Sequence, residues 1–206
     1  MAYHGVELQN SITIGKIFSI HYFEYMSNFS FAGESHNFWE FICVDKGEVG
    51  VTRGKSYTIL KKGDLIFHKP NEFHDVKATG GIAPNLVVIS FECNDDAMYF
   101  FNDRFLQIDE TERNLLASII IEARRCFDCR LDDPYLQNMP LKDPDTFGAQ
   151  QMIKLYLEHF LIHLIRRYSN PIVLSKNFRR LILRKLRKVT VMPRFLAVLW
   201  IIWKVI

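Results

Sequence analysis

Apolar and polar residues alternate in short runs over the first half of the chain, and turn residues separate the runs. Residues 12–25 are rich in β-branched and aromatic side chains, which favours a strand over a helix. The other strand-like runs lie at residues 38–44, 48–52, 57–60, 65–68, 73–78 and 86–91. Residues 28–33 are predicted to form a loop. Turns about every ten residues predict an antiparallel barrel or sandwich.

The spacing of apolar residues becomes helical after residue 108. Asp109, with Glu112 three residues later, has the spacing of a helix-capping box and predicts a helix over residues 109–127. The apolar face of this helix is formed by Leu115, Leu116, Ile119, Ala123, Cys126 and Phe127. A polar link at residues 131–145 leads to a second predicted helix at about residues 146–167. We therefore expect a mainly β fold with two C-terminal amphipathic helices.

The second predicted helix is apolar on two sides. Its main stripe consists of Ile153, Leu157, Phe160, Leu161 and Leu164, and Leu155 and Ile162 lie nearly opposite. A helix with two apolar faces needs two partners. We expect a homodimer in which the second copy contacts Leu155, Leu157, Leu161, Ile162 and Leu164. The alternative is that one chain covers both faces, because bundle packing and dimer packing use the same residue types.

The composition is that of an ordinary folded domain, with 49% hydrophobic and 24% charged residues among 206. Its charge is unevenly distributed. Residues 1–169 hold all 23 acidic residues and 17 of the 26 basic ones, a formal charge of −6, whereas residues 170–206 hold nine basic residues and no acidic one. Because contacts to phosphates need a basic patch, the first 169 residues are not expected to bind DNA by themselves.

Four irregularly spaced cysteines are too few for a disulfide framework, which indicates a reducing compartment. The N-terminus has neither a basic start nor an apolar run of export length, so we expect no signal peptide. These features predict a cytoplasmic protein.

The candidate chemistry lies in residues 33–47 and 63–74. If residues 34–40 form one strand, Glu34, His36, Phe38 and Glu40 point to one face and the residues between them point away. This arrangement aims polar side chains at the interior of a barrel. Such groups are costly to bury unless they satisfy one another or bind a ligand.

These two segments resemble the paired motifs of the cupin superfamily. The first motif is matched by His36, Glu40 and Gly47, and the second by Gly63, Asp64, Pro70 and His74. The resemblance implies a double-stranded β-helix barrel and places His36, Glu40 and His74 at metal-ligand positions. It departs from the metal-binding pattern at Glu34, where a histidine is usual.

Two interpretations of this pocket remain open. In the first, His36, Glu40, His74 and Glu34 hold Zn, Mn, Fe or Ni at an open site. In the second, which we prefer, no cofactor is needed. The same groups then hydrogen-bond a small polar effector, such as a sugar or another metabolite, between apolar walls that include Phe38 and Tyr57.

The order of the motifs, with two amphipathic helices after them, resembles the N-terminal effector-binding and dimerisation half of AraC-type transcription regulators, over roughly residues 6–168. The resemblance implies a barrel at residues 1–108, a dimerisation segment at residues 109–169, and DNA binding through a helix-turn-helix domain after the second helix. We expect an effector-sensing module rather than an enzyme. The alternative is a small metal-dependent cupin enzyme, an isomerase or dioxygenase.

Residues 170–206 do not resemble helix-turn-helix units. Their first half is basic and amphipathic, and their second half is apolar but too short to span a bilayer. A reading-frame change or truncation that removed the DNA-binding half explains this composition best. A tail that binds a membrane surface or a partner is the competing explanation.

Overall fold

The computed structural model of the chain describes residues 2–24, 26–79, 81–144 and 146–169. The chain divides into two compact units, Met1–Ile165 and Arg166–Ile206. The barrel and the site described below belong to the first unit. Of the second unit only the end of a helix, residues 166–169, is described, so the hypothesis of an out-of-frame or truncated tail lies outside the described residues.

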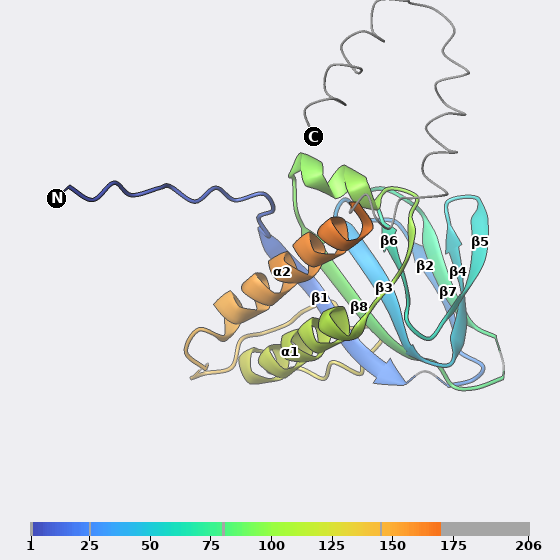
Figure 1. Ribbon diagram of the computed structural model, residues 1–206. Coiled ribbons are helices and arrows are strands. Elements are labelled where there is room, and N and C mark those ends of the chain that lie inside the picture. Colours follow the sequence, from blue (N-terminus) through green and yellow to red (C-terminus); the bar gives the residue numbers. More distant parts are fainter. Residues whose placement is uncertain (1, 25, 80, 145, 170–206) are drawn as a thin grey trace, which may run out of the picture. The chain divides into compact units, whose positions relative to one another are not determined.

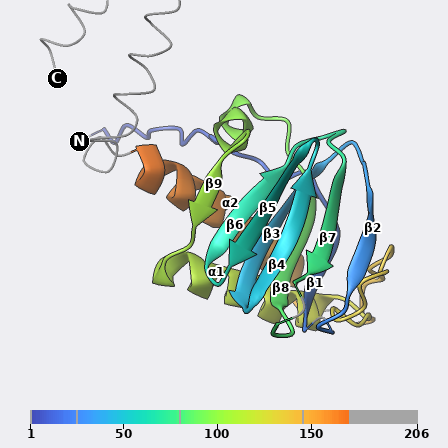
Figure 2. The ribbon, with the colours of Figure 1, turned by 90° about the vertical axis from the view of Figure 1, so that its right-hand side faces the viewer.

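The described residues of the first unit form two antiparallel sheets (Figure 1). The five-stranded sheet has the order β1 (Lys16–Glu24), β8 (Asn85–Glu92), β3 (Trp39–Lys46), β6 (Asp64–His68) and β9 (Phe105–Gln107). The four-stranded sheet has the order β2 (Ser30–Glu34), β7 (His74–Ala78), β4 (Glu48–Arg53) and β5 (Ser56–Lys61). In Figure 2 the four-stranded sheet lies toward the viewer, in front of the five-stranded sheet.

The space between the sheets is filled at one end by apolar side chains. This core consists of Phe23, Ile42, Val44, Val49, Val51, Leu60, Ile66, Val76, Leu86 and Val88. The residues come from alternate positions of their strands, as expected when one face of each strand points inward. On β3, Ile42 and Val44 therefore point between the sheets, and so does Glu40 two residues earlier.

Two helices cover the outer face of the five-stranded sheet (Figure 1). They are α1 (Glu110–Cys126) and α2 (Ala149–Ser169). Phe41 of β3 packs against Phe160 of α2 with ring centroids 5.2 Å apart. A short 3-10 helix, η1 (Asp96–Phe101), covers another part of this face, since Phe101 stacks on Phe67 of β6 at 4.1 Å. The outer face of the five-stranded sheet is thus packed by apolar side chains where these helices cover it.

The expected fold class, mainly β with two C-terminal helices, is confirmed. Helix α1 begins with the predicted capping box, in which Asp109 accepts a hydrogen bond from the backbone N–H of Glu112, and the Glu112 side chain accepts one from the backbone N–H of Asp109. The prediction of a loop at residues 28–33 is wrong, because Ser30–Glu34 forms β2. This strand is only partly buried, so its sequence lacks the apolar alternation that marks the other strands.

The structure corrects part of the expected dimer interface. Leu157, Leu161 and Leu164 are fully buried within the chain, at 0% exposure, because α2 packs them toward the sheet. They cannot contact a second copy in this fold. Leu155 is 48% exposed and Ile162 is half-buried, so a contact through these two residues stays a prediction.

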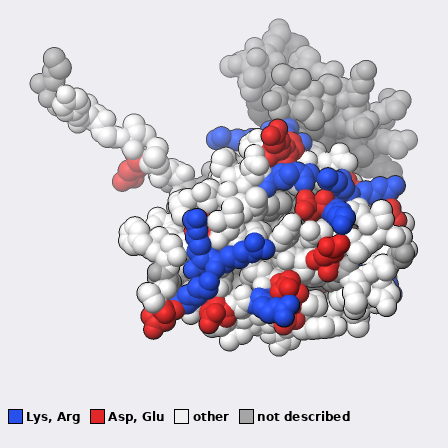
Figure 3. Space-filling model, turned by 90° about the horizontal axis from the view of Figure 1, so that it is seen from below, with Lys and Arg blue, Asp and Glu red and all other residues white. Residues whose placement is uncertain are grey.

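Charged side chains of both signs are interspersed over the described part of the face seen in Figure 3. No described helix is both long enough and apolar enough to cross a lipid bilayer.

Candidate functional site

Glu40 lies at the polar end of the space between the sheets. It is 6% exposed and is paired in register with Ser90 of β8. The Ser90 hydroxyl donates a hydrogen bond of 2.6 Å to Oε2 of Glu40, and the Oγ atoms of Ser19 and Ser90 are 2.9 Å apart. Because the single proton of Ser90 goes to the carboxylate, Ser19 must donate to Ser90. Three strands, β1, β8 and β3, therefore hold this carboxylate in place.

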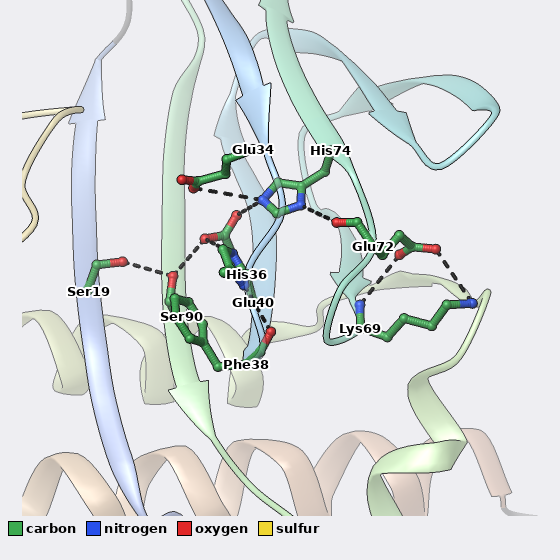
Figure 4. A network of polar contacts seen from close by, with 9 residues as sticks. All are labelled: Ser19, Glu34, His36, Phe38, Glu40, Lys69, Glu72, His74 and Ser90. Atoms are coloured by element: carbon green, nitrogen blue, oxygen red, sulfur yellow. Dashed lines mark hydrogen bonds and ion pairs between the residues drawn. The ribbon is translucent and has the colours of Figure 1, made fainter.

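Two imidazoles face Glu40 from the other side (Figure 4). His74 is the first residue of β7, and His36 lies in the turn between β2 and β3. Their Nε2 atoms are 3.3 Å and 3.7 Å, respectively, from oxygens of Glu40. Nδ1 of His36 lies 3.1 Å from the carbonyl oxygen of Phe38, and Nδ1 of His74 lies 2.9 Å from that of Glu72. Since a carbonyl can only accept, each Nδ1 carries a proton and donates it, which fixes both rings.

Glu34 completes the cluster from the end of β2. Its Oε1 atom is 3.9 Å from Nε2 of His74, with which it is paired in register, and its side chain is 50% exposed. The prediction that residues 34–40 form one strand is wrong, because β2 ends at Glu34 and β3 begins at Trp39. The two carboxylates and His36 nevertheless converge, since the connection between the strands returns the chain to the same end of the barrel.

Burial by itself raises the pKa of Glu40, but the facing imidazoles of His36 and His74 outweigh burial and hold the pKa well below its ordinary value. Burial lowers the pKa of His74, but Glu40 outweighs this effect, and the net pKa of His74 is raised. The buried side chains of Glu40 and His74 therefore each favour the charged form of the other.

His68 is fully buried beside this pair. Its ring stacks on the ring of His74, with centroids 4.2 Å apart, and it is paired in register with Glu40. Burial and the charge of His74 lower the pKa of His68 to about 3, so the ring is neutral at neutral pH. His68 supplies a flat wall behind His74 without adding a charge.

The cluster opens into a cavity of about 320 Å³ between the two sheets. Its apolar walls include Phe18, Phe29, Phe31, Phe38 and Val88. Phe38 is stacked between the rings of Phe18 and His36, at 3.9 Å and 3.8 Å. Residues 134–137, from the link between α1 and α2, also line the cavity. The space has one polar end and a largely aromatic remainder, as small-molecule sites have.

Tyr57 does not belong to this cavity, although we predicted it as a wall. It is 59% exposed, and its ring lies against Gly50 on the outer face of the four-stranded sheet. The reason is the register of β5, in which Leu60 points to the core and Tyr57 therefore points away. Sequence reasoning missed Ser19 and Ser90, although both are polar residues at inward-facing positions of predicted strands.

The donor atoms of Glu34, His36, Glu40 and His74 fit a divalent cation. One ligand atom from each residue lies within 4.8 Å of the others. Both imidazoles present Nε2 while Nδ1 is held by a backbone carbonyl, as in many histidine metal ligands. Two nitrogens and two carboxylates suit Zn, Mn, Fe or Ni.

A second group that could hold a metal, Asp109, Glu112 and His163, lies at the start of α1. The two carboxylates already accept backbone N–H groups of the helix cap. Oε1 of Glu112 is 3.1 Å from Nδ1 of His163 on α2. These contacts account for the group as a cap and a link between the helices.

Two facing antiparallel sheets, with the polar residues of both motifs converging at one end, define a cupin-type barrel. Residues 19–99 match the model of the family described as the AraC-like ligand binding domain. The match confirms the resemblance drawn from the sequence, over less than half of the chain. No curated protein matches the chain.

Three solved structures show partial similarity. A cupin 2 conserved barrel domain protein from Rhodopseudomonas palustris is 18% identical, with 47% of this chain and 60% of that chain covered and a TM-score of 0.32. A predicted oxalate decarboxylase from Thermotoga maritima is 20% identical, with 32% and 57% covered and a TM-score of 0.31. The cupin domain of Cnp3 from Schizosaccharomyces pombe is 15% identical, with 42% and 64% covered and a TM-score of 0.33. The chain spans less than two thirds of each of them.

Proposed function

We propose that the chain is the effector-sensing and dimerisation part of an AraC-type transcription regulator. The observation that carries this proposal is the cavity of about 320 Å³, most of whose lining residues belong to the part of the chain that matches the AraC-like ligand binding domain. In this proposal His36, Glu40, His74 and Glu34 hydrogen-bond a small molecule, and Phe38 contacts its apolar part.

The link between the helices offers a route from the cavity to the dimer. Residues 134–137 line the cavity, and the carbonyl of Leu131 accepts a 2.9 Å hydrogen bond from the backbone N–H of Tyr22 on β1. The other end of the link is paired to the end of α1 through Phe127 and Leu141. An occupant that prefers one position of this link also favours one arrangement of α1 and α2, and so of two subunits that meet through Leu155. A DNA-binding domain attached to each subunit would respond to that arrangement.

The experiment is a thermal-shift screen of the purified chain with a library of metabolites. A compound that binds only the folded state at about 100 times its Kd stabilises it by about 2.7 kcal/mol. We expect the shift to be lost in Phe38→Ala and retained in Tyr57→Ala, because only Phe38 lines the cavity. A compound whose shift survives Phe38→Ala and Glu34→Gln binds elsewhere, and such a result contradicts the proposed site.

A metal-dependent cupin enzyme, an isomerase or dioxygenase, is the second candidate. It is favoured by the donor set of Glu34, His36, Glu40 and His74. A bound metal would supply Lewis-acid or redox chemistry there. Metal analysis of the purified chain and of His74→Ala separates the candidates. Stoichiometric metal that is lost in the variant, together with turnover of a sugar or carbonyl compound, would favour the enzyme.

A further inference from the structure

The charged residues that line the cavity are acidic. Of its described lining residues, Glu34 and Glu40 are carboxylates, and none is a lysine or arginine. Nε2 of His74 lies 3.3 Å from a carboxylate oxygen of Glu40. His21 also lines the cavity, but burial lowers its pKa, so the ring is neutral at neutral pH. Among the described lining residues, the half-exposed carboxylate of Glu34 and the buried carboxylate of Glu40 thus share one close imidazole, that of His74, at 3.9 Å and 3.3 Å.

Two basic side chains near this end of the barrel, Lys69 and Arg53, lie outside the cavity. Nζ of Lys69 is 3.6 Å from a carboxylate oxygen of Glu72, and a guanidinium nitrogen of Arg53 is 4.0 Å from a carboxylate oxygen of Asp103. None of these four residues lines the cavity. A carboxylate or phosphate in the cavity would therefore meet two carboxylates and no cation that is free to pair with it, an arrangement that costs energy in a partly buried site.

The remaining walls also favour a positive charge. The walls carry several aromatic rings, among them Phe29 and Phe31 from the segment next to Glu34. The face of an aromatic ring carries partial negative charge and attracts a cation, while its area favours an apolar body. In Figure 4 Glu34 reaches toward His74 at the polar end of the cavity, above Glu40.

We propose that the cavity binds a small organic cation, a primary or secondary amine on an apolar body, with Glu34 accepting hydrogen bonds from the ammonium group. This inference rests on the proposed function, because it names the ligand class of the same cavity. The ammonium group lies at the polar end, and the apolar body lies among the phenylalanines.

Three compounds of similar shape test the charge preference: 2-phenylethylamine, 2-phenylethanol and 3-phenylpropanoate. Isothermal titration calorimetry at neutral pH measures the affinity of the purified chain for each. We expect the amine to bind about tenfold more tightly than the alcohol, the factor of one charge-assisted hydrogen bond, and the carboxylate to bind more weakly than both. Equal affinity for amine and alcohol, or tighter binding of the carboxylate, overturns the proposal.

The variant Glu34→Gln assigns the preference to one side chain. It should lower the affinity for the amine about tenfold and lower the affinity for the alcohol by clearly less, because the alcohol carries no charge and its hydroxyl can still donate to the amide oxygen. Glu24→Gln is the matched control, because Glu24 is an exposed strand carboxylate that pairs with Lys46 and does not line the cavity. An equal loss in both variants would mean a general effect of charge and would overturn the proposal.

Two further outcomes separate this inference from the proposed function. If none of the three compounds binds but neutral metabolites raise the melting temperature, the ligand class is wrong and the sensor remains. If neither the three compounds nor the neutral metabolites have any effect, both the amine proposal and the proposed sensor function fail. Titration with Zn²⁺ alone, followed by 3-phenylpropanoate, tests whether the cavity is a metal site. Binding of 3-phenylpropanoate only in the presence of Zn²⁺ overturns the proposal that the ligand is an amine.

Discussion

Replacing Glu40 by glutamine tests whether this buried carboxylate organises the polar end of the barrel. Glu40→Gln keeps the size of the side chain and an oxygen toward Ser90, which donates a 2.6 Å hydrogen bond to it. It removes the negative charge that lies 3.3 Å from Nε2 of His74. The variant should therefore be less stable, although the cavity and the strands around it keep their shape.

The size of the loss follows from what His74 can do in the variant. Breaking a buried ion pair costs about 3–5 kcal/mol when the remaining charge stays buried. Here the imidazole of His74 can release its proton, so the loss is closer to that of a hydrogen bond to a charged group, about 1.5–3 kcal/mol.

The loss of unfolding free energy should depend on pH, and the two pKa shifts determine whether it grows or shrinks as the pH rises. The pKa of His74 is raised above its ordinary value of 6.5, so its contribution is complete below pH 6.5 and is lost as the pH rises through the raised value. The pKa of Glu40 is lowered from 4.5, so its contribution is complete above pH 4.5 and is lost as the pH falls. The pair contributes most between these two values.

Urea denaturation of both proteins at pH 5.5 and pH 8.5 measures the effect. We expect the difference in the free energy of unfolding between wild type and Glu40→Gln to be larger at pH 5.5. Contributions from His21 and His68, whose pKa values are lowered by burial, are present in both proteins and largely cancel in the difference. An equal difference at both pH values, or a variant more stable than wild type at pH 5.5, would refute the ion pair between Glu40 and His74.

Three other predictions follow from packing. Phe160→Ala should lower the free energy of unfolding by about 3–5 kcal/mol in urea denaturation, because Phe160 is fully buried against Phe41, and a loss below about 1 kcal/mol would contradict this packing. Tyr57→Ala should leave the affinity of any cavity ligand unchanged in calorimetry. A tenfold loss of affinity would mean that Tyr57 contacts the ligand. Leu155→Glu should weaken self-association in analytical ultracentrifugation without changing the melting temperature. Gln151→Glu, a matched exposed change one turn earlier, should leave self-association unchanged. An unaltered dimer in Leu155→Glu would exclude this surface as the dimer interface.

Local sequence signals predicted most of the fold because they report local physical constraints. The capping box of Asp109 and Glu112 forms within one helical turn, so its spacing alone indicates where α1 begins. The inward-facing positions of β3 follow from the period of two along a strand. Strand β2 escaped prediction because only two of its five residues are even partly buried, and burial is what produces an alternating pattern.

The site was less predictable because it depends on how strands pair. The motifs indicated that His36, Glu40 and His74 meet, and the structure brings them together. The position of Tyr57 depended on the register of β5, and a shift of one residue reverses the face that a side chain occupies. The burial of His68 likewise depends on its pairing with Glu40, about which the sequence of β6 alone says nothing.

The two ends of the space between the sheets differ in their side chains, one being apolar and the other polar. Apolar side chains fill the space between the sheets at one end, and helices pack on the outer face of the five-stranded sheet, so much of the stability comes from outside the polar end. The polar end therefore keeps groups that a core would exclude. Both ring nitrogens of His68 are buried without a hydrogen-bond partner among the described residues. Glu34 shares the nearby imidazole of His74 with Glu40. Unpaired polar groups cost free energy in the folded state. A ligand cation that pairs with Glu34 forms a hydrogen bond to a charged acceptor, and this bond contributes to its affinity.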